Sequence, residues 1–196
     1  MSPRFSYDEL QIIPYLKRCK VSGFESTSPE LNEFLKEDAL KNQEELISKT
    51  YLCCYSNRLV GYVAFTTDII KKKDVQEEEH LEISYKEYPA IKIARLAVDK
   101  RYERRGVGRF LLLAAVGKAL KISEEVGCRF ITVDSKQESI GFYKKSGGFK
   151  LVRGYEKKKY PTMYFDVLPT IKEMKAMNTE IKDFSVAEST PSITKN

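Results

Sequence analysis

Residues 94–109 read Ala94-Arg95-Leu96-Ala97-Val98-Asp99-Lys100-Arg101-Tyr102-Glu103-Arg104-Arg105-Gly106-Val107-Gly108-Arg109. The segment is typical of a strand, a basic loop with two glycines and the start of a long helix. Backbone N–H groups at a helix N-terminus are unpaired and carry partial positive charge, so the segment can hold a phosphate. Gly106 and Gly108 let a ligand approach the backbone, and three nearby arginines add charge. The alternative is an ordinary helix start with solvated arginines.

A dinucleotide-binding site does not fit this segment. Leu111 stands where the Rossmann fingerprint needs its third glycine, and residues 99–105 separate the strand from the glycines. Asp134, which ends the next expected strand, is therefore not interpreted as a ribose-binding acid. No Walker A sequence occurs in the chain. The anion held here is of another kind.

Strands and helices are expected on both sides of this segment. Ser28-Pro29 opens a helix, with Ser as N-cap and Pro in the first turn, and roughly helical spacing continues to Leu46 and Ile47. A long helix is expected over 106–126, with Gly127 at its end, and a short one over 138–146. The pattern predicts a mixed α/β domain with a central sheet. Its strands are expected near residues 10–13, 50–55, 59–67, 91–98, 129–133, 149–152 and 162–167.

Length and composition indicate a globular protein. The chain has 196 residues, of which 42% are hydrophobic and 32% charged. We expect one domain over residues 1–177 and a disordered tail, rich in Ser, Thr and Lys, over 178–196. Residues 71–89 are expected to form an exposed loop. Neither a membrane span of about 18 apolar residues nor a signal-peptide core is found, so the prediction is a cytoplasmic protein.

Charge and the supply of metal ligands limit the chemistry. The net charge of +6 favours phosphates, nucleotides or nucleic acid as partners, and a mildly basic solvated surface is the alternative. One histidine, His80, and four cysteines without C-x-x-C spacing predict no metal site and reduced structural thiols.

Residues 94–109 resemble the acyl-CoA-binding motif of the GNAT superfamily of N-acetyltransferases, which is Gln or Arg, two residues, Gly, one residue, then Gly or Ala. Residues 139–149, with Phe142-Tyr143 and Gly148-Phe149, are similar to the family's Phe-Tyr-x-x-x-Gly-Phe segment. The order of elements matches from about residue 12 to 167. The resemblance implies an α/β (α+β) fold, with a mostly antiparallel sheet flanked by helices and splayed between the fourth and fifth strands.

The resemblance also implies residue roles. Acetyl-CoA would be the co-substrate, and no metal would be needed. Tyr143 would be the general acid that protonates the departing CoA thiolate, and a core aromatic is the alternative for this residue. Backbone groups of Leu96, Ala97 and Val98 would hold the pantetheine arm and polarise the thioester carbonyl. The pyrophosphate loop would comprise Arg104, Arg105, Gly106, Val107, Gly108 and Arg109.

In the implied reaction a neutral primary amine attacks the acetyl carbon directly. The base is left open between Glu82 or Glu87, a water relay, and an amine that arrives neutral. Tyr164 or a water would be the acid if Tyr143 is not.

Two positions depart from the family pattern. Glu103 stands where the family has Gln or Arg, and a carboxylate facing a diphosphate would repel it unless it turns outward. Gly147-Gly148 doubles the usual glycine and could shift the end of the helix that carries Tyr143.

The acceptor is suggested by a narrower resemblance. Residues 31–39 and 95–98 resemble the toxin-type branch, which acetylates the amino group of aminoacyl-tRNA. Such a substrate needs a basic surface, for which Lys71–Lys73 and Lys157–Lys159 are candidates unless they only keep loops soluble. The resemblance allows tRNA and a second copy of the chain as partners. A catalytically weak CoA- or nucleic-acid-binding module on the same fold is the competing hypothesis.

Overall fold

The computed structural model describes residues 5–76, 81–82 and 84–177. These residues form two compact units. The first contains the described residues up to Thr66 and Ala94–Ala115, and the second contains Thr67–Ile93 and Val116 to Met177. The single domain expected over 1–177 stays a prediction. The tail expected over 178–196, and His80, lie outside the described residues.

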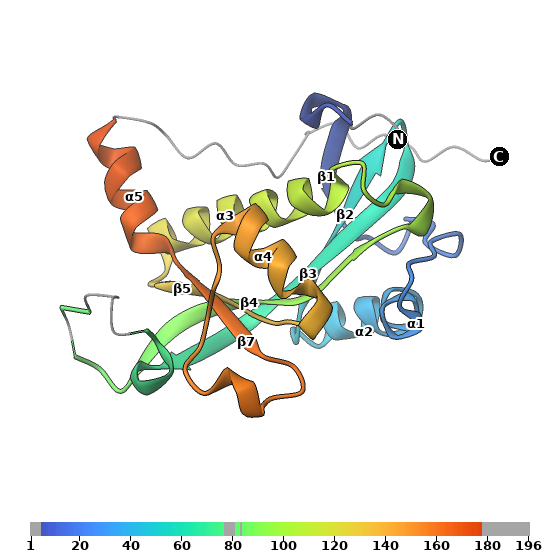
Figure 1. The fold of residues 1–196 in the computed structure, drawn as a ribbon. Coiled ribbons are helices and arrows are strands. Elements are labelled where there is room, and N and C mark those ends of the chain that lie inside the picture. The colour runs from blue at the N-terminus through green and yellow to red at the C-terminus, as the bar shows by residue number, and fades with distance from the viewer. Residues whose placement is uncertain (1–4, 77–80, 83, 178–196) are drawn as a thin grey trace. The chain divides into compact units, whose positions relative to one another are not determined.

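Within the described residues, seven strands form one sheet in the order β1-β2-β3-β4-β5-β7-β6 (Figure 1). The pairs β1–β2, β2–β3, β5–β7 and β6–β7 are antiparallel, whereas β4 and β5 are parallel. A mostly antiparallel sheet is therefore confirmed. The strands are β1 Leu10–Pro14, β2 Lys49–Tyr55, β3 Arg58–Lys71, β4 Glu87–Val98, β5 Phe130–Asp134, β6 Lys150–Leu151 and β7 Thr162–Asp166.

Strands β4 and β5 separate before β4 ends. Their registered pairs run from Ala90↔Phe130 to Ile93↔Val133, yet β4 continues to Val98. The last residues of β4 therefore leave their backbone groups on this side outside the ladder, and the expected splay between the fourth and fifth strands is confirmed.

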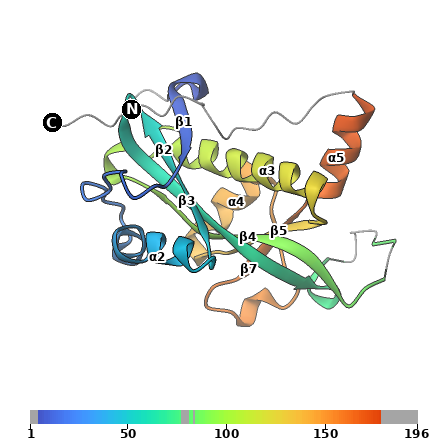
Figure 2. The ribbon, with the colours of Figure 1, turned by 180° about the vertical axis from the view of Figure 1, so that it is seen from behind.

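A helix with a π-helical turn in its middle covers β2 and β3 in the first unit (Figure 2). It consists of α1 (Pro29–Glu33), a π turn (Phe34–Asp38) and α2 (Ala39–Glu44). Leu35 and Ala39 are fully buried in a cluster with Leu52 and Tyr62. The start of this helix matches the prediction at Ser28-Pro29.

The predicted end of the same helix is wrong. Leu46 and Ile47 are not on its apolar face, because Leu46 has a left-handed backbone (φ 57°) and is 92% exposed. The Gln43 side chain holds the helix end instead: its amide donates to Tyr15 O (3.0 Å) and accepts from Thr50 N (3.0 Å). The π turn also changes the phase of the apolar stripe, so regular spacing no longer identifies the buried face.

Helix α3 (Val107–Glu125) matches its prediction, and Gly61 of β3 explains how closely it packs. A Cβ atom at Gly61 would lie 2.8 Å from Leu111 Cδ1 and 2.9 Å from Ala97 O. Only glycine therefore lets the first turns of α3 lie directly on β3 beside β4. Among the described residues, none of the helices has the length and apolar character to cross a membrane.

The second unit contains α4 (Ile140–Gly147) and a helix that the sequence patterns missed, α5 (Val167–Ala176). The carboxylate of Asp166 accepts a hydrogen bond from Leu168 N (2.9 Å) and caps α5. Asp166 followed by Pro169 is the local signal that identifies this helix start. The core of the unit includes edge-to-face contacts of Phe130 with Tyr88 and Tyr164.

We expect Gly61→Ala to lower the free energy of unfolding by about 2 kcal/mol, since the new methyl group must displace backbone or the packed α3. Gly127→Ala is the control, because no atom lies within 4 Å of its Cβ position. Urea unfolding of both variants measures the difference. Equal stability of the two variants would contradict this account of α3 packing.

Candidate active site

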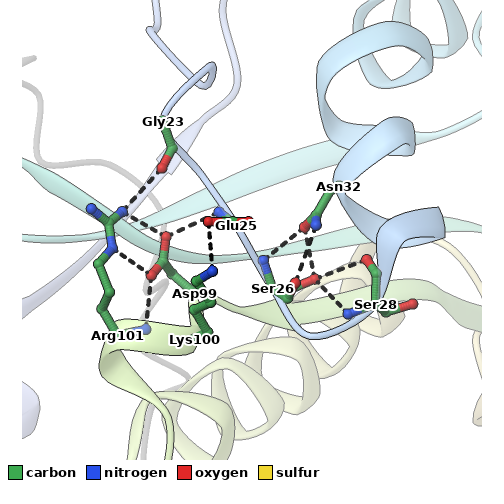
Figure 3. Close-up of polar contacts among 8 residues, drawn as sticks. All are labelled: Gly23, Glu25, Ser26, Ser28, Asn32, Asp99, Lys100 and Arg101. Atoms are coloured by element: carbon green, nitrogen blue, oxygen red, sulfur yellow. Dashed lines mark hydrogen bonds and ion pairs between the residues drawn. The ribbon is translucent and has the colours of Figure 1, made fainter.

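The carboxylate of Asp99 organises the turn between β4 and the glycine-containing loop (Figure 3). Asp99 is fully buried. Its Oδ1 accepts from Arg101 N (3.0 Å) and Arg101 Nε (2.8 Å), and its Oδ2 accepts from Arg101 Nη2 (2.7 Å) and Glu25 N (3.1 Å). Both oxygens of the buried charge are thus satisfied.

Further bonds tie this turn to the segment before the first helix. Arg101 Nη2 also donates to Gly23 O (3.0 Å), and Lys100 N donates to Glu25 O (2.8 Å). The Lys100 ammonium lies 2.8 Å from the Glu25 carboxylate. These bonds form a connection between residues 23–25 and residues 99–101, although the two segments lie far apart in the sequence.

Burial and hydrogen bonding have opposite effects on the pKa of Asp99. Burial on its own raises the pKa of this carboxyl, but the bonds from Arg101 and from Glu25 N outweigh it and hold the pKa below its ordinary value. No role for Asp99 was predicted from the sequence. An acidic residue at the end of a strand, followed directly by Lys and Arg, was the available signal.

The loop that follows has two residues with left-handed backbone conformation, one of which is a glycine. Arg104 (φ 59°) and Gly106 (φ 94°) have left-handed backbones, and α3 begins at Val107. Phe110 N donates to Gly106 O (3.0 Å), so the N–H groups of residues 107–109 precede the first bond of the helix. The N–H groups at the start of α3 are therefore available as donors, and that they hold an anion stays a prediction.

Two of the predicted arginines contact the N-terminal segment, which the sequence analysis missed. The guanidinium carbon of Arg105 lies 3.9 Å from the ring centroid of Phe5, and Phe5 N donates to Arg105 O (3.0 Å). Arg109 Nη1 donates to the Tyr7 hydroxyl (2.9 Å). The side chains of Arg105 and Arg109 are therefore held by contacts with Phe5 and Tyr7. Glu103 is exposed at the start of the loop.

Leu96, Ala97 and Val98 lie beyond the last registered pair of β4 with β5. Ala97 is buried, and the other two are half-buried. Their place at the splayed end of β4 is the one that the sequence analysis expected. That they hold a ligand stays a prediction.

Tyr143 lies in the second unit, on α4, and is 8% exposed. Its ring contacts Phe142 (centroids 5.1 Å apart) and Phe149 (5.8 Å). Burial raises the pKa of Tyr143 to about 12. Gly147 is the last residue of α4 and Gly148 (φ 68°) caps it, so the doubled glycine ends the helix in an ordinary way.

The other candidates for proton transfer, also in the second unit, differ in exposure. Tyr164, the second choice of acid, is fully buried, and its hydroxyl accepts a hydrogen bond from Gln76 N (3.0 Å). Glu82 and Glu87 are exposed. Asp134 lies 2.6 Å from the Lys92 ammonium. Among the described residues, no group of three or more His, Cys, Asp or Glu side chains could hold a metal ion.

Known proteins resemble this chain in the region that contains the segments described above. Residues 11–149 match the model of the acetyltransferase (GNAT) family, and this range includes both motifs described above. The chain belongs to the GNAT family. It is therefore an acyltransferase, as predicted, with acetyl-CoA as its co-substrate.

Relatives of this GNAT protein include a tRNA-acetylating toxin of Mycobacterium tuberculosis. The two are 30% identical over 124 residues, which is 63% of this chain and 74% of the relative. AtaT complexed with acetyl-methionyl-tRNAfMet matches with a TM-score of 0.74 at 20% identity, over 87% of this chain and 99% of that one. A Tyr-to-Phe mutant of KacT gives 0.73 at 21% identity, over 85% and 99%. At these identities the solved structures establish the shared fold.

We expect Asp99→Asn to destabilise the protein by about 2 kcal/mol at pH 7, because it removes the charge that Arg101 and Glu25 N solvate. The folded pKa of Asp99 is lowered, so its stabilising effect is complete above the unfolded pKa of about 3.9 and is lost as the pH falls through the folded value. The melting temperatures of variant and wild type should therefore converge in acid.

Glu25→Gln is the matched control, since it removes an exposed carboxylate from the same connection and should have a small effect. Melting curves at several pH values give the comparison. A pH-independent difference between Asp99→Asn and wild type would contradict the role of the Asp99 charge.

Proposed function

We propose that this acyltransferase transfers the acetyl group of acetyl-CoA to the α-amino group of an aminoacyl-tRNA. The observation that carries the proposal is the 30% identity with a tRNA-acetylating toxin, across 74% of that protein. The resemblance of residues 31–39 and 95–98 to the toxin-type branch points the same way.

Basic side chains in the second unit support a nucleic-acid substrate. Lys71–Lys73 are exposed at the end of β3, and Lys144 and Lys145 are exposed in the last turn of α4. Over residues 136–159 the only acidic residues are Glu138 and Glu156. A surface of this kind attracts the phosphate backbone of tRNA. The exposed basic residues of residues 136–159 include Lys144, Lys145, Lys150, Arg153, Lys158 and Lys159.

The first unit supplies the groups for the donor. The N–H groups at the start of α3 face outward from a helix N-terminus and suit the CoA diphosphate. On the side of β5, the backbone groups of Leu96–Val98 lie outside the strand ladder and suit hydrogen bonds to the pantetheine arm and to the thioester carbonyl, whose oxygen becomes negative during attack. The amine forms the new C–N bond and loses a proton, while the C–S bond breaks and the thiolate takes one up.

Tyr143 is proposed to give the thiolate its proton. With the pKa raised to about 12, the hydroxyl stays protonated across the neutral range and is always available as a donor. The apolar rings of Phe142 and Phe149 fix the tyrosine ring. The competing interpretation, a core aromatic, explains the same ring contacts without a role for the hydroxyl.

A catalytically weak CoA- or nucleic-acid-binding module is the second candidate, because Glu103 replaces the Gln or Arg of the family motif. Glu103 is exposed, which agrees with a carboxylate turned away from the diphosphate. Transfer activity separates the two candidates.

The proposed function predicts that the protein, given radiolabelled acetyl-CoA and a panel of aminoacyl-tRNAs, moves label into the tRNA fraction as N-acetyl-aminoacyl ester. Uncharged tRNA is the control and should take up no label. Label found only on free amino acids or polyamines would contradict the acceptor, and acetyl-CoA binding without any transfer would favour the weak module.

We expect Tyr143→Phe to lower kcat by about 100-fold while acetyl-CoA affinity stays unchanged, because the ring is kept and only the acid is lost. Tyr160→Phe, which removes an exposed hydroxyl from the same unit, is the matched control. Initial rates with a saturating acceptor, together with calorimetric titration of acetyl-CoA, give both quantities. Full turnover of Tyr143→Phe would assign the residue to the core.

A further inference from the structure

Arg95 of β4 has a guanidinium that is only partly paired. Nη1 donates to the neighbouring Ala94 O (2.8 Å), whereas Nε is buried and has no hydrogen-bond partner among the described residues. Nη2 lies 4.0 Å from the Glu30 carboxylate, too far for a hydrogen bond. The Glu30 side chain is 70% exposed, so this contact neutralises Arg95 weakly.

The Arg95 guanidinium lies over an aromatic ring. Its carbon is 5.2 Å from the centroid of Phe34. Phe34 in turn stacks on Tyr62 (centroids 6.1 Å apart, planes 19° apart), and the Tyr62 hydroxyl donates to Leu31 O (2.7 Å). The contact with Tyr62 thereby helps to hold the ring on which Arg95 lies.

The local helix is irregular at this point. Phe34 opens the π turn Phe34–Asp38, and π turns inside α-helices are frequent at functional sites. Since burying an unpaired donor costs free energy, the present position of Nε favours movement toward an acceptor. A stacked arginine with unpaired donors is suited to receiving a ligand.

The chemistry of that ligand follows from which donors are unpaired. Nε and Nη2 lie along the same edge of a guanidinium, and this edge matches two oxygens of a phosphate or carboxylate. Arg95 directly precedes Leu96–Val98, the splayed end of β4. We propose that Arg95 binds a phosphate of the acceptor, the phosphodiester nearest the nucleotide that carries the reacting amine. The inference rests on the proposed function, in which the acceptor is an aminoacyl-tRNA.

The test uses cytidylyl-adenosine, a dinucleotide with one phosphodiester that corresponds to the 3′ end of tRNA, and adenosine, which has none. Each is titrated into the full chain saturated with CoA. We expect Arg95→Met to weaken cytidylyl-adenosine binding at least about tenfold, because a charge-assisted bidentate contact is lost. Adenosine binding and acetyl-CoA affinity should not change.

Arg58→Met is the matched control, since it removes the same charge from the exposed first residue of β3 and should bind the dinucleotide like wild type. Arg95→Lys keeps the charge without the planar edge and should bind with intermediate affinity. If Arg95→Met melts at a lower temperature than wild type, the comparison of Arg95→Lys with wild type provides the test. Equal dinucleotide affinity of wild type, Arg95→Met and Arg95→Lys, including no binding by any of them, would overturn the proposal.

The transfer assay keeps this inference separate from the proposed function. Arg95-dependent dinucleotide binding without transfer to any aminoacyl-tRNA would remove the proposed function and leave the phosphate site. Transfer to aminoacyl-tRNA with unchanged dinucleotide binding in Arg95→Met would leave the function and remove the site.

Discussion

The buried carboxylate of Asp99 joins three parts of the first unit. It follows β4 directly, it receives the N–H of Glu25 from a segment 74 residues earlier, and it fixes Arg101 at the start of the glycine-containing loop. In surroundings of low dielectric constant such bonds are strong when satisfied and costly when broken. The direction in which the loop enters α3, and with it the orientation of the N–H groups at residues 107–109, depends on this single side chain.

Gly61 imposes the complementary constraint from the strand. It lets α3 lie against β3 at a distance that no other residue allows, while Asp99 holds the loop that leads into the helix. The family motif names the two glycine positions of the loop and the Gln or Arg position that Glu103 occupies here. In this protein, the position of that loop is set by a residue of β3 and by a carboxylate before the loop, neither of which belongs to the motif.

Sequence patterns predicted the helices and strands that depend mainly on residues close together in the sequence. The glycine segment, the long α3, the start of the helix at Ser28-Pro29 and the splay between β4 and β5 follow from spacing or from the family resemblance. The parallel pairing of these two strands was not predicted. The features that were missed depend on distant contacts. Leu46 leaves the helix because Gln43 bonds to Tyr15 and Thr50, and the side chains of Arg105 and Arg109 are placed by Phe5 and Tyr7. Such contacts leave no period in the sequence, whereas the Asp166 cap of α5 did leave a readable signal.

The contacts of Phe5 and Tyr7 have a consequence for how the protein is made. Tyr7 meets Arg109 across 102 positions of the chain, and Phe5 meets the loop at Arg105. During synthesis the N-terminal residues leave the ribosome long before their partners exist, and contacts of such sequence separation form slowly. The contacts of Phe5 and Tyr7 with Arg105 and Arg109 therefore form only after the start of α3 has emerged, whereas the contact of Phe5 with Tyr55 can form earlier. A nascent chain that stops before residue 105 lacks Arg105 and the glycine-containing loop that leads into α3, so this loop is among the last described parts of the first unit to pack.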